Sequence, residues 1–132
     1  MADALESLAR TALGNAYAPY SRFRVGAALE SVDGRRFFGC NVESASYGLT
    51  ICAERAAVTA AVAEGVRRLA RLVIVTERGA PAPPCGACRQ VLAEFGTDLV
   101  IRSVSGPAER SWRLSELLPD PFGLEAEGEE GR

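Results

Sequence analysis

The chain has 132 residues and a net charge of −2, and its composition, 48% hydrophobic and 24% charged, is that of one globular domain. It contains no His, and all 15 basic residues are Arg, which excludes Ser-His-Asp and Cys-His nucleophiles, Schiff bases on Lys and Walker-type phosphate loops. Because four Glu and one Arg occupy the last eight positions, the rest of the chain is nearly neutral, and neither nucleic acid nor a membrane is favoured as a partner.

The first part of the chain has the pattern of a helix followed by a β-hairpin. Apolar residues recur at helical spacing and predict a helix over Asp3–Ala16. Two short apolar runs, Val25–Glu30 and Arg36–Val42, flank an Asp-Gly pair, which is a strong hairpin signal. Charged residues in the first ten positions stand where a signal peptide would need an apolar core, so we expect a cytoplasmic protein.

The rest of the chain alternates helices with apolar strands. A polar loop over Asn41–Leu49 precedes Cys52–Glu64, which is rich in Ala, lacks Pro and predicts a helix capped by Thr50 and ended by Gly65. The later elements are predicted in the order strand, helix, strand, strand and short helix: Arg71–Thr76, Cys85–Phe95, Asp98–Val104, Arg110–Leu114 and Ser115–Leu118.

This order of elements predicts an α/β layered domain. A strand-helix-strand crossover makes its two strands parallel neighbours, and the hairpin adds antiparallel strands, so we expect a mixed sheet with helices on both faces. One domain is expected over residues 1–124, followed by a flexible acidic tail over residues 125–132. Ligands of such sheets bind where helices begin after the carboxyl ends of strands. Both Cys-bearing helices are predicted to begin in that way.

Three of the four Cys lie at predicted helix starts. Cys85 and Cys88 are three positions apart, so both sulfurs project from one helix face, and Cys52 begins the other helix. Three thiolates leave one position of a tetrahedral zinc ion open, which is typical of catalytic sites, whereas structural sites have four protein ligands. Cys40 would be the fourth ligand of a closed site. It stands inside an apolar strand, where packing is its expected role.

Neighbouring residues could complete a catalytic zinc site. Glu54, two positions after Cys52, could take a proton from zinc-bound water and return it to a substrate atom. Arg55 and Gln90 could donate hydrogen bonds to thiolate sulfur and offset its charge, and the two helix dipoles would act in the same direction. The alternative for Glu54 and Arg55 is an ordinary solvated helix surface.

Two motifs are similar to those of a known family. They are Cys52-Ala53-Glu54 and Pro84-Cys85-Gly86-Ala87-Cys88-Arg89-Gln90. These motifs resemble the signature of the zinc nucleoside deaminases, and Cys before Ala-Glu is similar to the small homotetrameric cytidine deaminases. The similarity covers most of residues 15–122. It implies a three-layer α/β/α sandwich with a mixed five-stranded sheet, one Zn²⁺ per subunit and a homotetramer with shared active sites.

The resemblance also implies a reaction and a set of substrate contacts. The reaction is the hydrolytic deamination of cytidine and deoxycytidine to uridine, deoxyuridine and ammonia in pyrimidine salvage, with zinc-bound hydroxide as nucleophile and Glu54 as proton shuttle. Seven residues match substrate-binding positions: Phe23, Asn41, Glu43, Ala45, Tyr47, Ala53 and Phe122. Of these, Ala45, Tyr47 and Phe122 match positions that reach the site from neighbouring subunits.

Three other functions stay open on the sequence alone. The first is a binding module with a closed four-thiolate zinc site. The second is a dithiol oxidoreductase that uses Cys85 and Cys88, which would give Cys52 and Glu54 no role. The third is a deaminase of nucleic acid, against which the near-neutral charge and the enclosed, shared site both argue.

Overall fold

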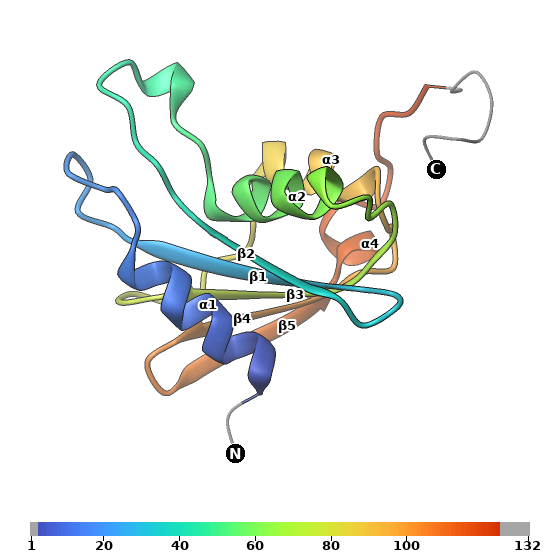
Figure 1. Ribbon diagram of the computed structural model, residues 1–132, viewed down its shortest axis with the longest axis horizontal. Helices are drawn as coiled ribbons and strands as arrows, with labels where there is room; N and C mark the ends of the chain where they lie inside the picture. The colour runs from blue at the N-terminus through green and yellow to red at the C-terminus, as the bar shows by residue number, and fades with distance from the viewer. Residues whose placement is uncertain (1–2, 125–132) are drawn as a thin grey trace.

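A mixed five-stranded sheet in the order β2-β1-β3-β4-β5 forms the middle of the molecule (Figure 1). The computed structural model describes residues 3–124, so the predicted acidic tail lies outside the described residues. The strands are β1 Val25–Ser31, β2 Arg36–Cys40, β3 Leu69–Thr76, β4 Val100–Ser105 and β5 Ala108–Arg113. Only β3 and β4 pair in parallel among these neighbours, which confirms the predicted crossover.

Helices cover both faces of this sheet and give three layers (Figure 1). One face carries α1, Ala4–Gly14, and the other carries α2, α3 and α4, at Ala53–Ala63, Gly86–Ala93 and Leu114–Leu117. Each face has its own cluster of buried apolar side chains. Strands between two such clusters are buried on both sides, which is why β3 has an uninterrupted apolar run over residues 72–75. The α/β/α sandwich expected from the sequence is therefore confirmed.

Two glycines let helices lie directly on the hairpin strands. A Cβ at Gly26 would lie 1.9 Å from the carbonyl oxygen of Ala9 in α1, and a Cβ at Gly39 would lie 2.5 Å from the backbone nitrogen of Ala57 in α2. Both distances are far below any real carbon contact with backbone. The close approach of α2 to β2 thus requires Gly39.

The predicted helices differ from the observed ones by one or two residues at each end, and the predicted cap of α2 is a different residue. Cys52 is its N-cap residue, whereas the Thr50 hydroxyl accepts a hydrogen bond from the Ser44 backbone N–H at 3.0 Å. The prediction of Thr50 as the cap was wrong, because this hydroxyl stabilises the preceding loop. That loop also contains a 3-10 turn, η1, over Tyr47–Leu49. Gly65 follows the C-cap with a φ of +91°, as expected for the residue that ends a helix.

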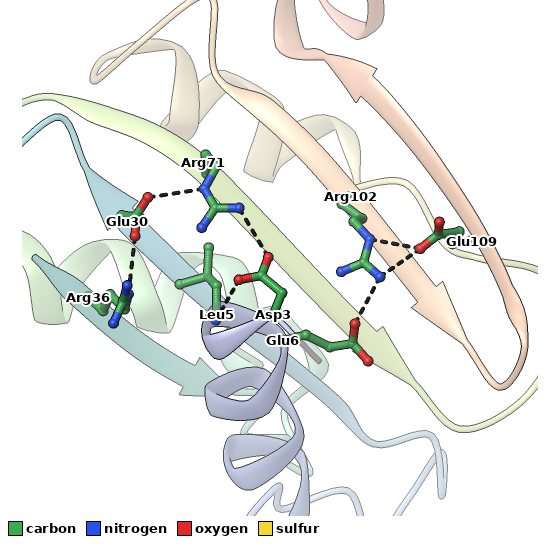
Figure 2. Close-up of polar contacts among 8 residues, drawn as sticks. All are labelled: Asp3, Leu5, Glu6, Glu30, Arg36, Arg71, Arg102 and Glu109. Carbon is green, nitrogen blue, oxygen red and sulfur yellow. Dashed lines mark hydrogen bonds and ion pairs between the residues drawn. The ribbon is translucent and has the colours of Figure 1, made fainter. Parts of the chain in front are cut away.

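The first turn of α1 is held to the sheet by two Arg (Figure 2). Arg71 on β3 donates to the N-cap residue Asp3 and to Glu30 on β1, both at 3.0 Å. Arg102 on β4 donates to Glu6 on α1 at 2.9 Å. These contacts join the start of the chain to strands about 70 to 100 positions further on. Within residues 3–124, no helix has the length and apolar character needed to cross a bilayer.

Candidate metal centre

Three cysteine sulfurs converge where α2 and α3 begin. The Sγ atoms of Cys52, Cys85 and Cys88 all lie within 4.8 Å of one another, and those of Cys52 and Cys85 are 3.9 Å apart. Cys40, in β2, is not part of this group. Among the described residues the cluster therefore has three thiol ligands and no fourth, which is the arrangement that leaves one metal position open.

The local backbone explains how each helix presents its sulfur. Cys52 and Cys85 are the N-cap residues of α2 and α3, with extended backbone, so each side chain stands at a positive helix end. The Cys85 sulfur also accepts the backbone N–H of Cys88 at 3.4 Å, in the place that a Ser or Asp oxygen takes in an ordinary cap. Both effects favour thiolate at this end of the sheet.

Charge within the cluster is distributed unevenly. A hydrogen bond with Cys88 lowers the pKa of the Cys52 thiol to about 5, and Arg55 adds to this effect. The Arg55 guanidinium lies 3.4 Å from the Cys52 sulfur, so the structure places this side chain where it can offset thiolate charge. The pKa of the Cys88 thiol is raised, because it shares its proton with Cys52 and is buried. One thiolate is thus already favoured next to a guanidinium.

Glu54 is a buried carboxyl beside this cluster. Glu54 lies in the first turn of α2 and is only 6% exposed. Burial raises the pKa of Glu54 to about 7, and the negative charge of Cys52 acts in the same direction. A carboxyl with a pKa near neutrality can both accept and release a proton at physiological pH.

The donor set fits a zinc ion. Zinc binds readily to sulfur ligands, whereas magnesium and calcium prefer oxygen ligands. Three thiolates also need positive charge nearby, which Arg55 and the two helix ends provide. The N-cap positions of Cys52 and Cys85 also hold the two sulfurs at fixed helix ends. The cluster could therefore hold zinc through three sulfurs and leave its remaining position to a ligand from solution.

Two of the residues predicted to bind substrate hold the loop before β1. The Asn41 amide donates to the carbonyl of Phe23 at 2.8 Å and accepts the N–H of the first β1 residue at 2.9 Å. The Glu43 carboxylate accepts the backbone N–H groups of Tyr20 and Ser21, each at 3.1 Å, together with the Ser21 hydroxyl. These bonds orient both side chains and leave some of their lone pairs free.

Glu43 and Tyr47 line one pocket of about 260 Å³. Ser21 and Thr50 complete its lining, and the sequence analysis missed both as pocket residues. Short hydroxyl side chains in loops give no periodic signal that would single them out. Tyr47 is 76% exposed and meets the Tyr20 ring edge to face, with centroids 6.4 Å apart.

The remaining predicted contacts lie in different surroundings. Ala53 is fully buried at the start of α2, whereas Ala45 is exposed and Phe122 is 71% exposed. Gln90 takes a different part from the one expected. Its amide bonds to the backbone of Phe122 instead of a sulfur.

One further residue at the loop before β1 was also missed. The Arg78 guanidinium lies 5.3 Å from the centroid of the Phe23 ring and donates to the Arg22 carbonyl at 2.9 Å. Arg22 is the one non-glycine residue with positive φ (57°) among the described residues. Arg78 thus supports both the ring predicted to face the pyrimidine and the strained turn before it.

A family model and several known proteins match most of this chain in sequence. The family described as "Cytidine and deoxycytidylate deaminase zinc-binding region" matches residues 2–104. A cytidine deaminase of Mycobacterium tuberculosis is 50% identical over 122 residues, which is 92% of this chain and 89% of that protein. One of Halalkalibacterium halodurans is 48% identical over 113 residues, 83% of this chain and 85% of that protein.

Solved structures agree with these matches. The crystal structure of cytidine deaminase from Burkholderia pseudomallei superposes with a TM-score of 0.86 at 47% identity, over 92% of this chain and 100% of that one. Sequence, fold and the three-cysteine cluster thus lead to the same assignment. The chain belongs to the cytidine and deoxycytidylate deaminase zinc-binding family.

Proposed function

We propose that this chain catalyses the hydrolytic deamination of cytidine and deoxycytidine, with one zinc ion per subunit held by Cys52, Cys85 and Cys88. The observation that carries the proposal is the convergence of three sulfurs beside the buried carboxyl of Glu54. Relatives that are named cytidine deaminase support the nucleoside as the substrate. The products would be uridine or deoxyuridine and ammonia.

The cluster supplies the metal ligands and their charge balance. Zinc, when bound, supplies Lewis acidity that lowers the pKa of a coordinated water toward ~7. Three thiolates around a divalent ion carry one net negative charge, which opposes that acidity. Arg55, 3.4 Å from the Cys52 sulfur, withdraws part of this charge through its hydrogen bond. The two helix ends at Cys52 and Cys85 act in the same way.

Glu54 moves the protons of the reaction. It takes a proton from the attacking water and delivers it to N3 of the pyrimidine as the new C4–O bond forms. It then passes the second proton of the water to the amino group, so that the C4–N bond breaks and ammonia leaves. Water and cytidine are consumed in equal amounts, and the carboxyl returns to its starting state. A pKa of about 7 suits a group that must both take and give protons.

The loop contacts suggest how the nucleoside is held. Hydrogen bonds from Ser21 and the Tyr20 backbone lower the pKa of the Glu43 carboxyl, so it is an ionised acceptor suited to ribose hydroxyls. Asn41 is oriented by its two backbone bonds and would hold the same sugar. The Phe23 ring would lie against the pyrimidine, and the Ala53 backbone would contact the base.

A homotetramer with shared active sites is part of the proposal. Ala45, Tyr47 and Phe122 are all exposed, as expected for residues that would reach a neighbouring subunit's site. Other large apolar side chains are also exposed on the loops before β1 and α2: Tyr17, Tyr20, Val42, Leu49 and Ile51. Tyr20 contacts Tyr47, and Val42 forms isolated bridges with Tyr17 and Ile51. Clustered exposed apolar residues are typical of an interface.

The test is a direct assay of the purified protein. The absorbance change from cytidine to uridine should be seen with zinc-loaded protein, should disappear after treatment with a strong chelator and should return when zinc is restored. Deoxycytidine should behave in the same way. Absence of turnover on both nucleosides in protein that holds one zinc per subunit would refute the proposed function.

A further inference from the structure

The side chain of Gln90 forms a reciprocal pair of hydrogen bonds with one residue of the C-terminal segment. Its amide nitrogen donates to the carbonyl of Phe122 at 2.8 Å, and its amide oxygen accepts the N–H of Phe122 at 3.2 Å. Both polar groups of the side chain are thereby used, in the pattern of two paired strands. The backbone of Phe122 is fixed in position and in orientation by a single side chain.

The preceding residue of α3 holds the same segment at a second point. Arg89 donates to the Leu117 carbonyl at 3.0 Å, at the end of α4, and to the Pro84 carbonyl at 2.8 Å, just before Cys85. Figure 1 shows the chain leaving α4 beside α3. Two consecutive residues of the metal-binding helix thus attach the segment 117–122, one at its start and one at its end.

The ring of Phe122 does not take part in this attachment. The residue is 71% exposed, so its fixed backbone presents an aromatic ring to the outside of its own subunit. Fixing the backbone of Phe122 adds little to the stability of the subunit itself, because most of the Phe122 side chain remains exposed. Clamping is useful if the ring must occupy a defined place against another molecule.

We infer that Gln90 is a positioning residue, which fixes the backbone at Phe122 and thereby holds the Phe122 ring for the substrate site of a second copy of the chain. The inference deepens the proposed function, because the destination of the ring rests on the shared site proposed there. The first half of the inference, that Gln90 fixes the backbone of Phe122, does not depend on the proposed function, because it follows from the two hydrogen bonds between these residues. In this arrangement the helix that supplies two metal ligands to its own site also sets the place of an aromatic ring in a neighbouring one.

The attachment can be measured without any assay of activity. In zinc-loaded protein, Gln90→Met keeps the length of the side chain and removes both hydrogen-bonding groups, so hydrogen exchange of the Phe122 amide should become about tenfold faster or more. Glu94→Met, at the exposed C-cap residue of α3 one turn further on, is the matched control and should leave that rate unchanged. An unchanged Phe122 exchange rate in Gln90→Met would overturn the inference.

The destination of the ring requires a double-mutant cycle on KM for cytidine. Phe122→Ala should raise KM by about tenfold, the usual value of an aromatic contact, and Gln90→Met should raise it by no more than that. The double variant should match Phe122→Ala alone, because Gln90 acts through the ring. If the increases in KM of the two single variants multiply in the double variant, the inference is overturned. Loss of zinc from Gln90→Met would also overturn it, because that result would indicate that Gln90 acts on the sulfurs.

Two further results keep the outcomes separate. If Gln90→Met does not fold, Gln90→Glu replaces it, since this side chain keeps the acceptor for the Phe122 N–H and loses the donor to the carbonyl; faster exchange is again expected, and an unchanged rate again refutes the attachment. If zinc-loaded wild-type protein does not deaminate cytidine, the proposed function fails, whereas the exchange experiment still decides whether Gln90 fixes Phe122.

Discussion

Replacing Glu54 with Gln should leave zinc in place and remove nearly all turnover. The change keeps the size of a buried side chain that is 6% exposed, so it opens no cavity. Gln cannot exchange a proton near neutral pH, whereas burial holds the pKa of the Glu54 carboxyl at about 7. The variant therefore separates proton transfer from metal binding and from packing.

The size of the effect follows from the surroundings of Glu54. General acid–base catalysis contributes about 10²- to 10⁴-fold per group. Glu54 is the only acidic residue in the first turns of α2 and α3, so no second carboxyl at these helix starts can replace it. Because one carboxyl serves the water, N3 and the leaving ammonia, we expect the upper value, about 10⁴-fold in kcat, which is ~5.4 kcal/mol of barrier.

The assay is the cytidine absorbance change, normalised to the zinc content of each preparation. Glu64→Gln is the matched control, because it makes the same chemical change at the far end of α2, on a side chain that is 67% exposed, and should retain wild-type turnover. A Glu54→Gln protein that holds zinc and turns over cytidine at a rate near wild type would refute the proton-shuttle reasoning. Loss of zinc would refute the assumption that Glu54 is not a ligand.

Three other predictions concern metal binding and stability. Cys40→Ala should keep one zinc per subunit, whereas Cys88→Ala should lose it, because Cys88 belongs to the sulfur cluster and Cys40 does not. Elemental analysis measures the zinc content, and loss of zinc from Cys40→Ala would favour a closed four-thiolate site. Ser103→Ala should leave the free energy of unfolding unchanged or raise it by up to about 1 kcal/mol, since its buried hydroxyl has no partner; denaturant titration that shows a loss above 1 kcal/mol would contradict this. Hydrogen bonds from Arg10 and then Arg102 lower the pKa of Glu6 below its usual 4.5, so the stability that ionised Glu6 contributes is present above pH 4.5 and is lost as the pH falls through the lowered pKa. The free energy of unfolding of Glu6→Gln should therefore be about 1 kcal/mol below that of the wild type at pH 7. A difference between the two proteins that does not narrow in acid would contradict the reasoning.

The sequence could predict those features that depend on local pattern. The hairpin around Asp-Gly, the crossover between β3 and β4, and the sulfurs at two helix starts follow from spacing and from turn residues, and all are present. The cap of α2 was placed at Thr50 because hydroxyl side chains usually fill that role. Cys52 takes the position instead, and its sulfur faces the other thiols rather than the helix N–H groups.

Contacts between distant segments could not be predicted in this way. Arg71 and Asp3 are 68 positions apart, and Gln90 and Phe122 are 32 apart. Periodicity indicates which face of an element is apolar, but it does not state which charged or amide side chains meet once the elements are packed. The pairing of Gln90 with a backbone is a clear case, since the sequence motif alone suggested a sulfur as its partner.

The glycine in β2 determines how closely α2 packs on the sheet and, through α2, where one side of the metal centre lies. Only a hydrogen atom fits between Gly39 and the backbone of α2, so any larger residue must lift that helix away from the sheet. α2 carries one sulfur and Glu54, while the other two sulfurs belong to α3; the atoms nearest to a Cβ at Gly39 all belong to α2. Moving α2 away from the sheet would therefore separate the Cys52 sulfur from the other two. Gly39 has no side chain that could react or bind a metal, yet a larger residue at this position would disturb the arrangement of the three ligands.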